Sequence, residues 1–195
     1  MSPKSATARL RWTLLSGGIL LLGYCGFVMA DARMFQYREN AEMQRLLVTP
    51  GAPGAPPAMA RSGLIGRIEV PRLGLSAVVM EGDDAATLRR AVGHIPGTAL
   101  PGQSGNTGVS AHRDTFFRPL KDIRTDDEIS VTTLEGEFRY RVVSTEIVSP
   151  DDVDVLAPTS KEALTLVTCY PFYFVGSAPK RFIVRAERVF SQSER

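Results

Sequence analysis

The chain has 195 residues, which is enough for one globular domain with a sizeable core and a short appendage. Its 23 basic and 21 acidic side chains are interspersed, so the formal net charge of +2 indicates no strong field directed at nucleic acid. Only two cysteines and two histidines are present, whereas a zinc site usually takes three or four protein ligands. The composition thus leaves no room in these residues for a second enzyme domain and disfavours a zinc enzyme.

The first segment has the pattern of a membrane anchor. Residues 1–12 contain Lys4, Arg9 and Arg11 without an acidic residue, and residues 13–30 contain no charged residue. A helix of that length spans about 27 Å, close to the lower limit for crossing a hydrocarbon core. The positive-inside rule then predicts a cytoplasmic N-terminus. We therefore expect a single-pass protein of the cell membrane whose remaining residues are extracytoplasmic.

Two other interpretations of this segment stay open. A basic region followed by an apolar stretch also describes a cleavable signal peptide, and Ala30 and Ala32 supply small residues for cleavage. Cys25 would suit a lipoprotein signal, although the bulky Tyr24 before it fits such a signal poorly. We favour a retained anchor. In that case Cys25 cannot reach a domain outside the bilayer, and Cys169 is a free thiol.

The composition changes twice after the anchor. Residues 31–48 are rich in helix formers and predict a juxtamembrane helix. Residues 49–57 contain four prolines and two glycines, which predict an extended, semi-rigid spacer. The expected organisation is a basic cytoplasmic segment (1–12), a transmembrane anchor (13–30), a juxtamembrane helix with a Pro/Gly-rich linker (31–62) and a folded domain (63–195).

From about Gly63 onward the pattern is that of β-strands. Polar and apolar residues alternate over 67–70 and 138–142, and residues 75–80, 164–169 and 183–189 are largely apolar or β-branched runs. One short helix is predicted over residues 84–92, opened by paired aspartates and ended by Gly93. Many short strands with Gly/Pro-rich connections indicate a mainly β domain, a largely antiparallel barrel or sandwich.

Cys169 ends one of the predicted strands, because Pro171 follows closely and cannot continue a central ladder. Strand ends commonly present reactive groups, since the scaffold fixes them while the adjoining loop admits substrate. Cys169 is therefore a candidate nucleophile; a buried cysteine acting as a small hydrophobe is the alternative. As a nucleophile, a thiol needs a positive neighbour at neutral pH.

Three residues are candidates for a position beside Cys169. His112 follows a short apolar stretch and is placed at a strand end, whereas His94 adjoins Gly93, where a turn-stabilising role is simpler. Arg181 lies twelve residues after Cys169, so a loop could bring the two strand ends together. Its guanidinium could stabilise an oxyanion or orient a substrate. The alternative is a solvated arginine at a strand edge.

Taken together, these residues resemble the sortase family. Thr-Leu-Val-Thr-Cys at 165–169 is similar to the Thr-Leu-x-Thr-Cys signature of sortases, and Arg181 stands where the family has an arginine on the next strand. His-Arg-Asp-Thr at 112–115 resembles the segment that carries the family histidine, and residues 93–106 are similar to class D and related sortases. The resemblance covers residues 63–190. One departure is Ser110-Ala111, where a glycine often precedes the histidine.

The resemblance implies an eight-stranded sortase-type β-barrel with short helices and the activity of a cysteine transpeptidase. Cys169 would cleave an LPxTG-like sorting signal of surface proteins after Thr through a thioacyl intermediate. An amine acceptor, such as a peptidoglycan stem peptide or a pilin lysine, would then resolve it. His112 would act as acid and base and Arg181 would hold the oxyanion. Further candidates for substrate contact are Thr168, Tyr170 and Asn106.

The sequence also bears on metal binding and on two competing functions. Acidic residues at 126–128, Asp151, Asp152 and Asp154 lie near loops where some sortases bind calcium, but their spacing matches no EF-hand. Solvated turn carboxylates are the simpler interpretation, so we predict no metal ligands and no cofactor. A cysteine endopeptidase that uses water, and an anchored binding domain without catalysis, remain alternatives.

Overall fold

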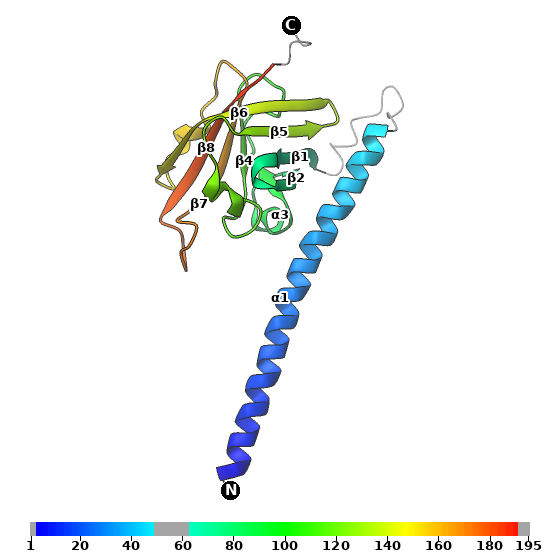
Figure 1. Cartoon of the computed structure of the whole chain (residues 1–195), viewed down its shortest axis with the longest axis vertical. Helices are drawn as coiled ribbons and strands as arrows, with labels where there is room; N and C mark the ends of the chain where they lie inside the picture. Colours follow the sequence, from blue (N-terminus) through cyan, green and yellow to red (C-terminus); the bar gives the residue numbers. More distant parts are fainter. Residues whose placement is uncertain (1–2, 49–62, 191–195) are drawn as a thin grey trace.

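The computed structural model describes residues 3–48 and 63–190, which form one long helix and a β-barrel (Figure 1). The helix α1 runs without a break over Pro3–Val48. By length and composition it is a candidate membrane span. The boundary predicted at residue 30 therefore falls inside a single helix, and the predicted Pro/Gly spacer lies outside the described residues. The other predicted domain limits stay predictions.

Eight strands form the closed barrel, in the spatial order β1-β2-β3-β4-β7-β8-β6-β5. Most pairs are antiparallel, but β2–β3 and β4–β7 are parallel. The strands are β1 Leu64–Val70, β2 Leu75–Glu81, β3 Val92–His94, β4 Asn106–Ser110, β5 Glu128–Thr133, β6 Gly136–Val148, β7 Ala163–Tyr170 and β8 Lys180–Arg188. Short helices connect them: η1 Pro71–Leu73, α3 Ala85–Arg90, η2 Arg118–Asp122 and η3 Val153–Leu156. The expected mainly β barrel of eight strands is confirmed.

The barrel is filled by apolar side chains that alternate along its strands. Ile68 of β1, Leu164 and Leu166 of β7 and Val184 of β8 are fully buried in one continuous core. Burial of each such side chain contributes about 1.5–3 kcal/mol to folding. The next residues along β7 and β8 point to the opposite face of the sheet, where Thr165 and Ile183 are also covered. This core therefore fixes which face of β7 and β8 each side chain occupies.

The short helix predicted over residues 84–92 begins as expected and ends earlier. Asp84 is its N-cap, and its carboxylate accepts hydrogen bonds from the backbone N–H of Ala86 at 2.8 Å and of Thr87 at 3.3 Å. The predicted end was wrong, because α3 stops at Arg90 and Gly93 lies within β3. A Cβ on Gly93 would stand 2.3 Å from the carbonyl oxygen of Gly82. Gly93 therefore permits close strand pairing rather than ending a helix.

The C-terminal half of α1 packs on the barrel. Asp31 forms an ion pair of 2.7 Å with Arg90 of α3. Gln36 donates to the carbonyl oxygen of Arg90 and accepts from the backbone N–H of Val78, both at 2.8 Å. Met43 is buried with Leu64, Val78 and Met80 in a second apolar cluster. Polar and apolar contacts therefore join the helix to β1, β2 and α3 over several turns.

A charged hydrogen bond joins the β1–β2 connection to the segment before β5. Arg72 donates to both carboxylate oxygens of Asp127, with Nη2 2.6 Å from Oδ2, and also to the carbonyl oxygen of Asp122. Asp127 further accepts from the backbone N–H of Arg124 at 2.8 Å. These hydrogen bonds, led by that from Arg72, hold the pKa of the buried Asp127 below its usual range.

We expect Asp127→Asn to destabilise the protein at pH 7 by about 1–3 kcal/mol, because the charged partner of Arg72 is lost. A carboxyl group whose pKa is lower in the folded state stabilises above its unfolded pKa, and that stability disappears as the pH falls through the folded value. The difference between variant and wild type should therefore shrink below about pH 4. Thermal unfolding followed by circular dichroism at several pH values measures it.

Asp122→Asn is the matched control, since the exposed Asp122 side chain pairs with its neighbour Lys121 and the hydrogen bond from Arg72 goes to its backbone carbonyl. It should change stability by less than about 0.5 kcal/mol. An Asp127→Asn deficit that is as large at pH 3 as at pH 7 would contradict the assignment.

Candidate active site

The register of β7 and β8 places the thiol beside the guanidinium. Cys169 and Arg181 are direct partners in this antiparallel pair. Directly opposed residues direct their side chains to the same face of a sheet. Because Leu166 of β7 and Val184 of β8 point into the core, Cys169 and Arg181 both lie on the outer face.

The candidate histidine reaches the same end through β4. This strand pairs in parallel with β7, with Ser110 opposite Val167. The contact continues beyond the strand, because the Ala111 N–H donates to Val167 at 3.3 Å and the Thr168 hydroxyl donates to the Ala111 carbonyl at 2.8 Å. His112 is the next residue and is exposed. We call this end of β4, β7 and β8 the catalytic end, because it carries the three candidate catalytic residues Cys169, His112 and Arg181.

The side chains at the catalytic end are accessible. Cys169 is a free, half-buried thiol, and Arg181 is also half-buried. Nη1 of Arg181 donates to the carbonyl oxygens of Ala178 at 3.4 Å and Lys180 at 3.1 Å. Both bonds use the same nitrogen. The guanidinium is therefore tethered to the connection after β7 while Nε and Nη2 remain suited to donate to a substrate oxygen.

Two of the further candidates adjoin the catalytic end and one does not. Thr168 is buried, with its hydroxyl bonded to Ala111, and Tyr170 lies in an aromatic group with Phe172 and Phe182, at centroid distances of 6.1 and 6.4 Å. Asn106 begins β4 and so lies at its opposite end. There it is buried, donates to the Val155 carbonyl at 3.1 Å and accepts from the Thr165 hydroxyl at 2.7 Å. The structure thus separates Asn106 from His112.

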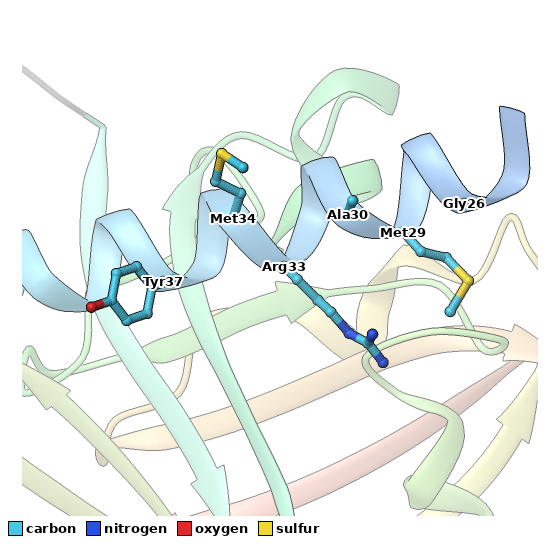
Figure 2. A pocket seen from close by; sticks show the side chains of 6 residues that line it. All are labelled: Gly26, Met29, Ala30, Arg33, Met34 and Tyr37. Carbon is cyan, nitrogen blue, oxygen red and sulfur yellow. The ribbon is translucent and has the colours of Figure 1, made fainter. Parts of the chain in front are cut away.

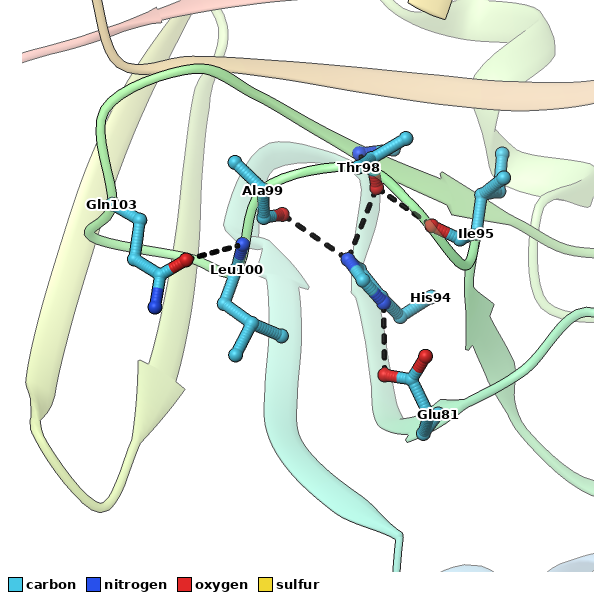
Figure 3. Close-up of polar contacts among 8 residues, drawn as sticks. Glu81, His94, Ile95, Thr98, Ala99, Leu100 and Gln103 are labelled. Atoms are coloured by element: carbon cyan, nitrogen blue, oxygen red, sulfur yellow. Dashed lines mark hydrogen bonds and ion pairs between the residues drawn. The ribbon is translucent and has the colours of Figure 1, made fainter.

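His94 stabilises the loop that follows β3, as the sequence suggests. Its buried ring lies with Nδ1 2.9 Å from a carboxylate oxygen of Glu81 and Nε2 3.1 Å from the carbonyl oxygen of Ala99 and 3.0 Å from the Thr98 hydroxyl (Figure 3). The Thr98 hydroxyl donates to the Ile95 carbonyl and accepts from the Gly108 N–H. His94 is therefore engaged on both ring nitrogens and connects β2, β3 and the loop before β4.

Sequence reasoning missed Arg113, the residue after His112. Its guanidinium donates to three backbone carbonyl oxygens in the connection after β7, those of Pro171 at 2.9 Å, Phe174 at 2.8 Å and Gly176 at 3.1 Å. It also lies 5.8 Å from the centre of the Phe174 ring. Arg113 therefore ties the histidine segment to the loop that follows the cysteine. Only its position beside His112 marks it out among 23 basic residues.

No three His, Cys, Asp or Glu side chains come together as a metal site in residues 3–48 and 63–190. Of the acidic residues singled out in the sequence, Asp127 is engaged by Arg72. A broad hollow also lies along α1, lined by Gly26, Met29, Ala30, Arg33, Met34 and Tyr37 (Figure 2). All of these belong to α1, so the hollow is separate from the catalytic end.

Comparison with known proteins identifies the family. The chain matches the Sortase domain family over residues 68–189, which is more than half of its length. The chain belongs to the sortase family. Sortases are cysteine transpeptidases, and of the two cysteines only Cys169 lies within the matched residues.

The proteins most usefully compared with this chain, by sequence and by structure, are also sortases. The chain is 31% identical to Sortase D of Bacillus subtilis (strain 168) over 192 residues, which cover 90% of this chain and 96% of that protein. It superposes on a Clostridium perfringens Sortase D5 transpeptidase with a TM-score of 0.67 and 25% identity, covering 80% of this chain and 99% of the other. Sortase A from Corynebacterium diphtheriae gives a TM-score of 0.63 at 25% identity, with 85% and 87% covered.

We expect Arg113→Ala to lower kcat/KM for a sorting peptide about tenfold, equivalent to ~1.4 kcal/mol, because the loop after Cys169 loses three hydrogen bonds. The loss should fall mainly on kcat, and Arg113→Lys should recover part of it. Steady-state kinetics and a melting curve of each variant provide the measurement. Arg141→Ala is the control, since Arg141 is exposed on β6 with one ion pair of 3.9 Å. Kinetics of Arg113→Ala equal to those of Arg141→Ala would refute the positioning role.

Proposed function

We propose that this sortase is a membrane-anchored transpeptidase that uses Cys169 to cleave an LPxTG-like sorting signal and joins the released acyl group to an amine. The observation that carries this proposal is the register that pairs Cys169 with Arg181 and brings the residue after Ala111 to the same end of the barrel. A nucleophile, a proton carrier and a fixed cation are the three groups that acyl transfer requires.

In the proposed first step, the Cys169 thiol gives its proton to His112, and the sulfur attacks the carbonyl carbon of the Thr residue in the sorting signal. The peptide C–N bond breaks as the thioester forms, and the leaving amine takes a proton from His112. Arg181 donates hydrogen bonds to the oxyanion that develops on the attacked carbonyl. Its tether to Ala178 and Lys180 holds the guanidinium in place before substrate arrives, which lowers the cost of reorganisation.

In the second step, a primary amine attacks the thioester carbon. His112 removes a proton from that amine and passes it to the sulfur as the C–S bond breaks and the new amide bond forms, which returns Cys169 as the thiol. The exposure of His112 suits it to a group that must exchange protons with both the leaving and the incoming amine. A peptidoglycan stem peptide or a pilin lysine has the required chemistry. No step calls for a metal or a cofactor.

The proposed setting is the outer surface of the cell membrane. The apolar part of α1 would span the bilayer, with Lys4, Arg9 and Arg11 on the cytoplasmic side. The barrel would then face surface proteins that carry a C-terminal sorting signal.

Cys169→Ala should abolish cleavage and transfer, since it removes the only thiol at the catalytic end. We expect His112→Ala and Arg181→Ala each to lower kcat/KM at least about a hundredfold, as for loss of one acid–base group or one oxyanion donor. The full chain in detergent is incubated with an LPxTG peptide and an amine, and mass spectrometry measures the cleaved peptide, the joined product and the acyl-enzyme.

Cys25→Ala is the matched control and should retain full activity. Activity that persists in Cys169→Ala would refute the nucleophile assignment. Cleavage without joining to any of diaminopimelate, triglycine or lysine would favour an endopeptidase instead. Binding of the peptide by Cys169→Ala and wild type alike, without cleavage by either, would favour a binding domain. A rate that falls with chelator and recovers with calcium would contradict the metal-free scheme.

A further inference from the structure

The connection between β7 and β8 exposes three consecutive apolar or aromatic side chains. Tyr173 is 74% exposed, Phe174 44% and Val175 100%. Adjacent apolar side chains held in water cost about 25 cal/mol for each Å² that a partner could cover. A contiguous exposed apolar surface of this kind commonly marks contact with a protein or a membrane. We call residues 173–175 the loop tip.

Basic side chains surround the loop tip. Arg113 lies against Phe174, and the Arg118 guanidinium lies 5.6 Å from the centre of the Tyr173 ring. Lys121 is near Tyr173, and Lys180 follows the loop at the start of β8. The acidic residues beside them are Asp114 and Asp122, and Asp122 is paired with Lys121. Exposed aromatic side chains with a basic rim are the composition of surfaces that lie in the headgroup region of anionic bilayers.

The packing of α1 on the barrel fixes the position of the loop tip along the axis of α1. The contacts begin at Asp31, the first charged residue after the apolar stretch, and continue through Gln36 to Met43. With α1 anchored as proposed above, the barrel is held next to the point where α1 would leave the bilayer. In Figure 1 the orange connection after β7 projects from the barrel in the direction in which α1 runs toward its N-terminus. In that anchored arrangement the loop tip would point toward the membrane.

Exposed apolar side chains on α1 continue past residue 30, beyond the apolar stretch. The hollow along α1 is lined by Met34 and Tyr37, which are 53% and 77% exposed, and also by Arg33 (Figure 2). Tyrosine, and arginine on a long apolar stem, are enriched where helices cross the interface. The interfacial layer on α1 thus overlaps the turns on which the barrel packs.

We propose that the loop tip inserts into the outer interface of the bilayer as a second membrane contact of this sortase. Tyr173, Phe174 and Val175 enter the headgroup and upper acyl region, while the basic rim contacts lipid phosphates. The catalytic end then opens close to the lipid surface. This inference rests on the anchoring stated under Proposed function, and it assigns lipid, rather than substrate peptide, as the partner of the loop tip.

The test uses the single tryptophan of the chain, Trp12. Val175→Trp and Tyr173→Trp are each made in a full-length Trp12→Phe background. They are reconstituted in nanodiscs of phosphatidylcholine and phosphatidylglycerol, with or without bromine on the upper acyl chain. The control is Glu135→Trp in the exposed β5–β6 turn, which projects on the side of the C-terminal end of α1 (Figure 1).

We expect both loop-tip tryptophans to show blue-shifted emission in nanodiscs and to lose intensity in brominated lipid, whereas Trp at position 135 does neither. Equal quenching at positions 175 and 135 would overturn the proposal. So would a blue shift at position 175 that requires a sorting peptide and is insensitive to bromine, which would make the loop tip a peptide-binding surface. The readout needs no turnover, so quenching in a protein without transpeptidation would leave this inference standing and refute only the proposed function.

Discussion

The pairing of β7 with β8 is the constraint on which the catalytic end depends, because it fixes both face and register at once. Leu164, Leu166 and Val184 must stay in the core, so Cys169 and Arg181 are forced to the outer face as direct partners. A slip of one residue would bury the thiol and expose the core. Stability of the barrel and geometry of the catalytic end are thus set by the same apolar side chains.

The parallel pairing of β4 with β7 brings His112 to the same end of the barrel, through a weaker connection than the one between β7 and β8. Two hydrogen bonds, through Ala111 and Thr168, continue that pairing past the end of β4. Arg113 then connects the same segment to the loop after β7. His112 therefore sits on a segment held at both sides but free of regular strand structure. This leaves the imidazole exposed while its backbone is restrained.

Local patterns made much of this architecture predictable. Alternation and β-branched runs located strands such as β2 and β7, and Pro171 placed Cys169 at a strand end. The end of α3 could not be found in this way, because Gly93 looks like a helix stop yet is required by the approach of Gly82 across the sheet. Asn106 similarly lies near His112 in sequence but at the other end of β4. Arg113 depends on carbonyl oxygens about sixty residues away, which no local pattern reveals.

The close packing of α1 on the barrel has a consequence for any shortened form of the protein. Met43 fills a cluster with Leu64, Val78 and Met80, and Gln36 satisfies the backbone N–H of Val78. A soluble fragment that begins at residue 63 would uncover this apolar cluster and leave that N–H to solvent. Such a fragment would be prone to self-association through the exposed side of β1 and β2. A fragment that begins before Asp31 would retain the part of α1 that covers this cluster.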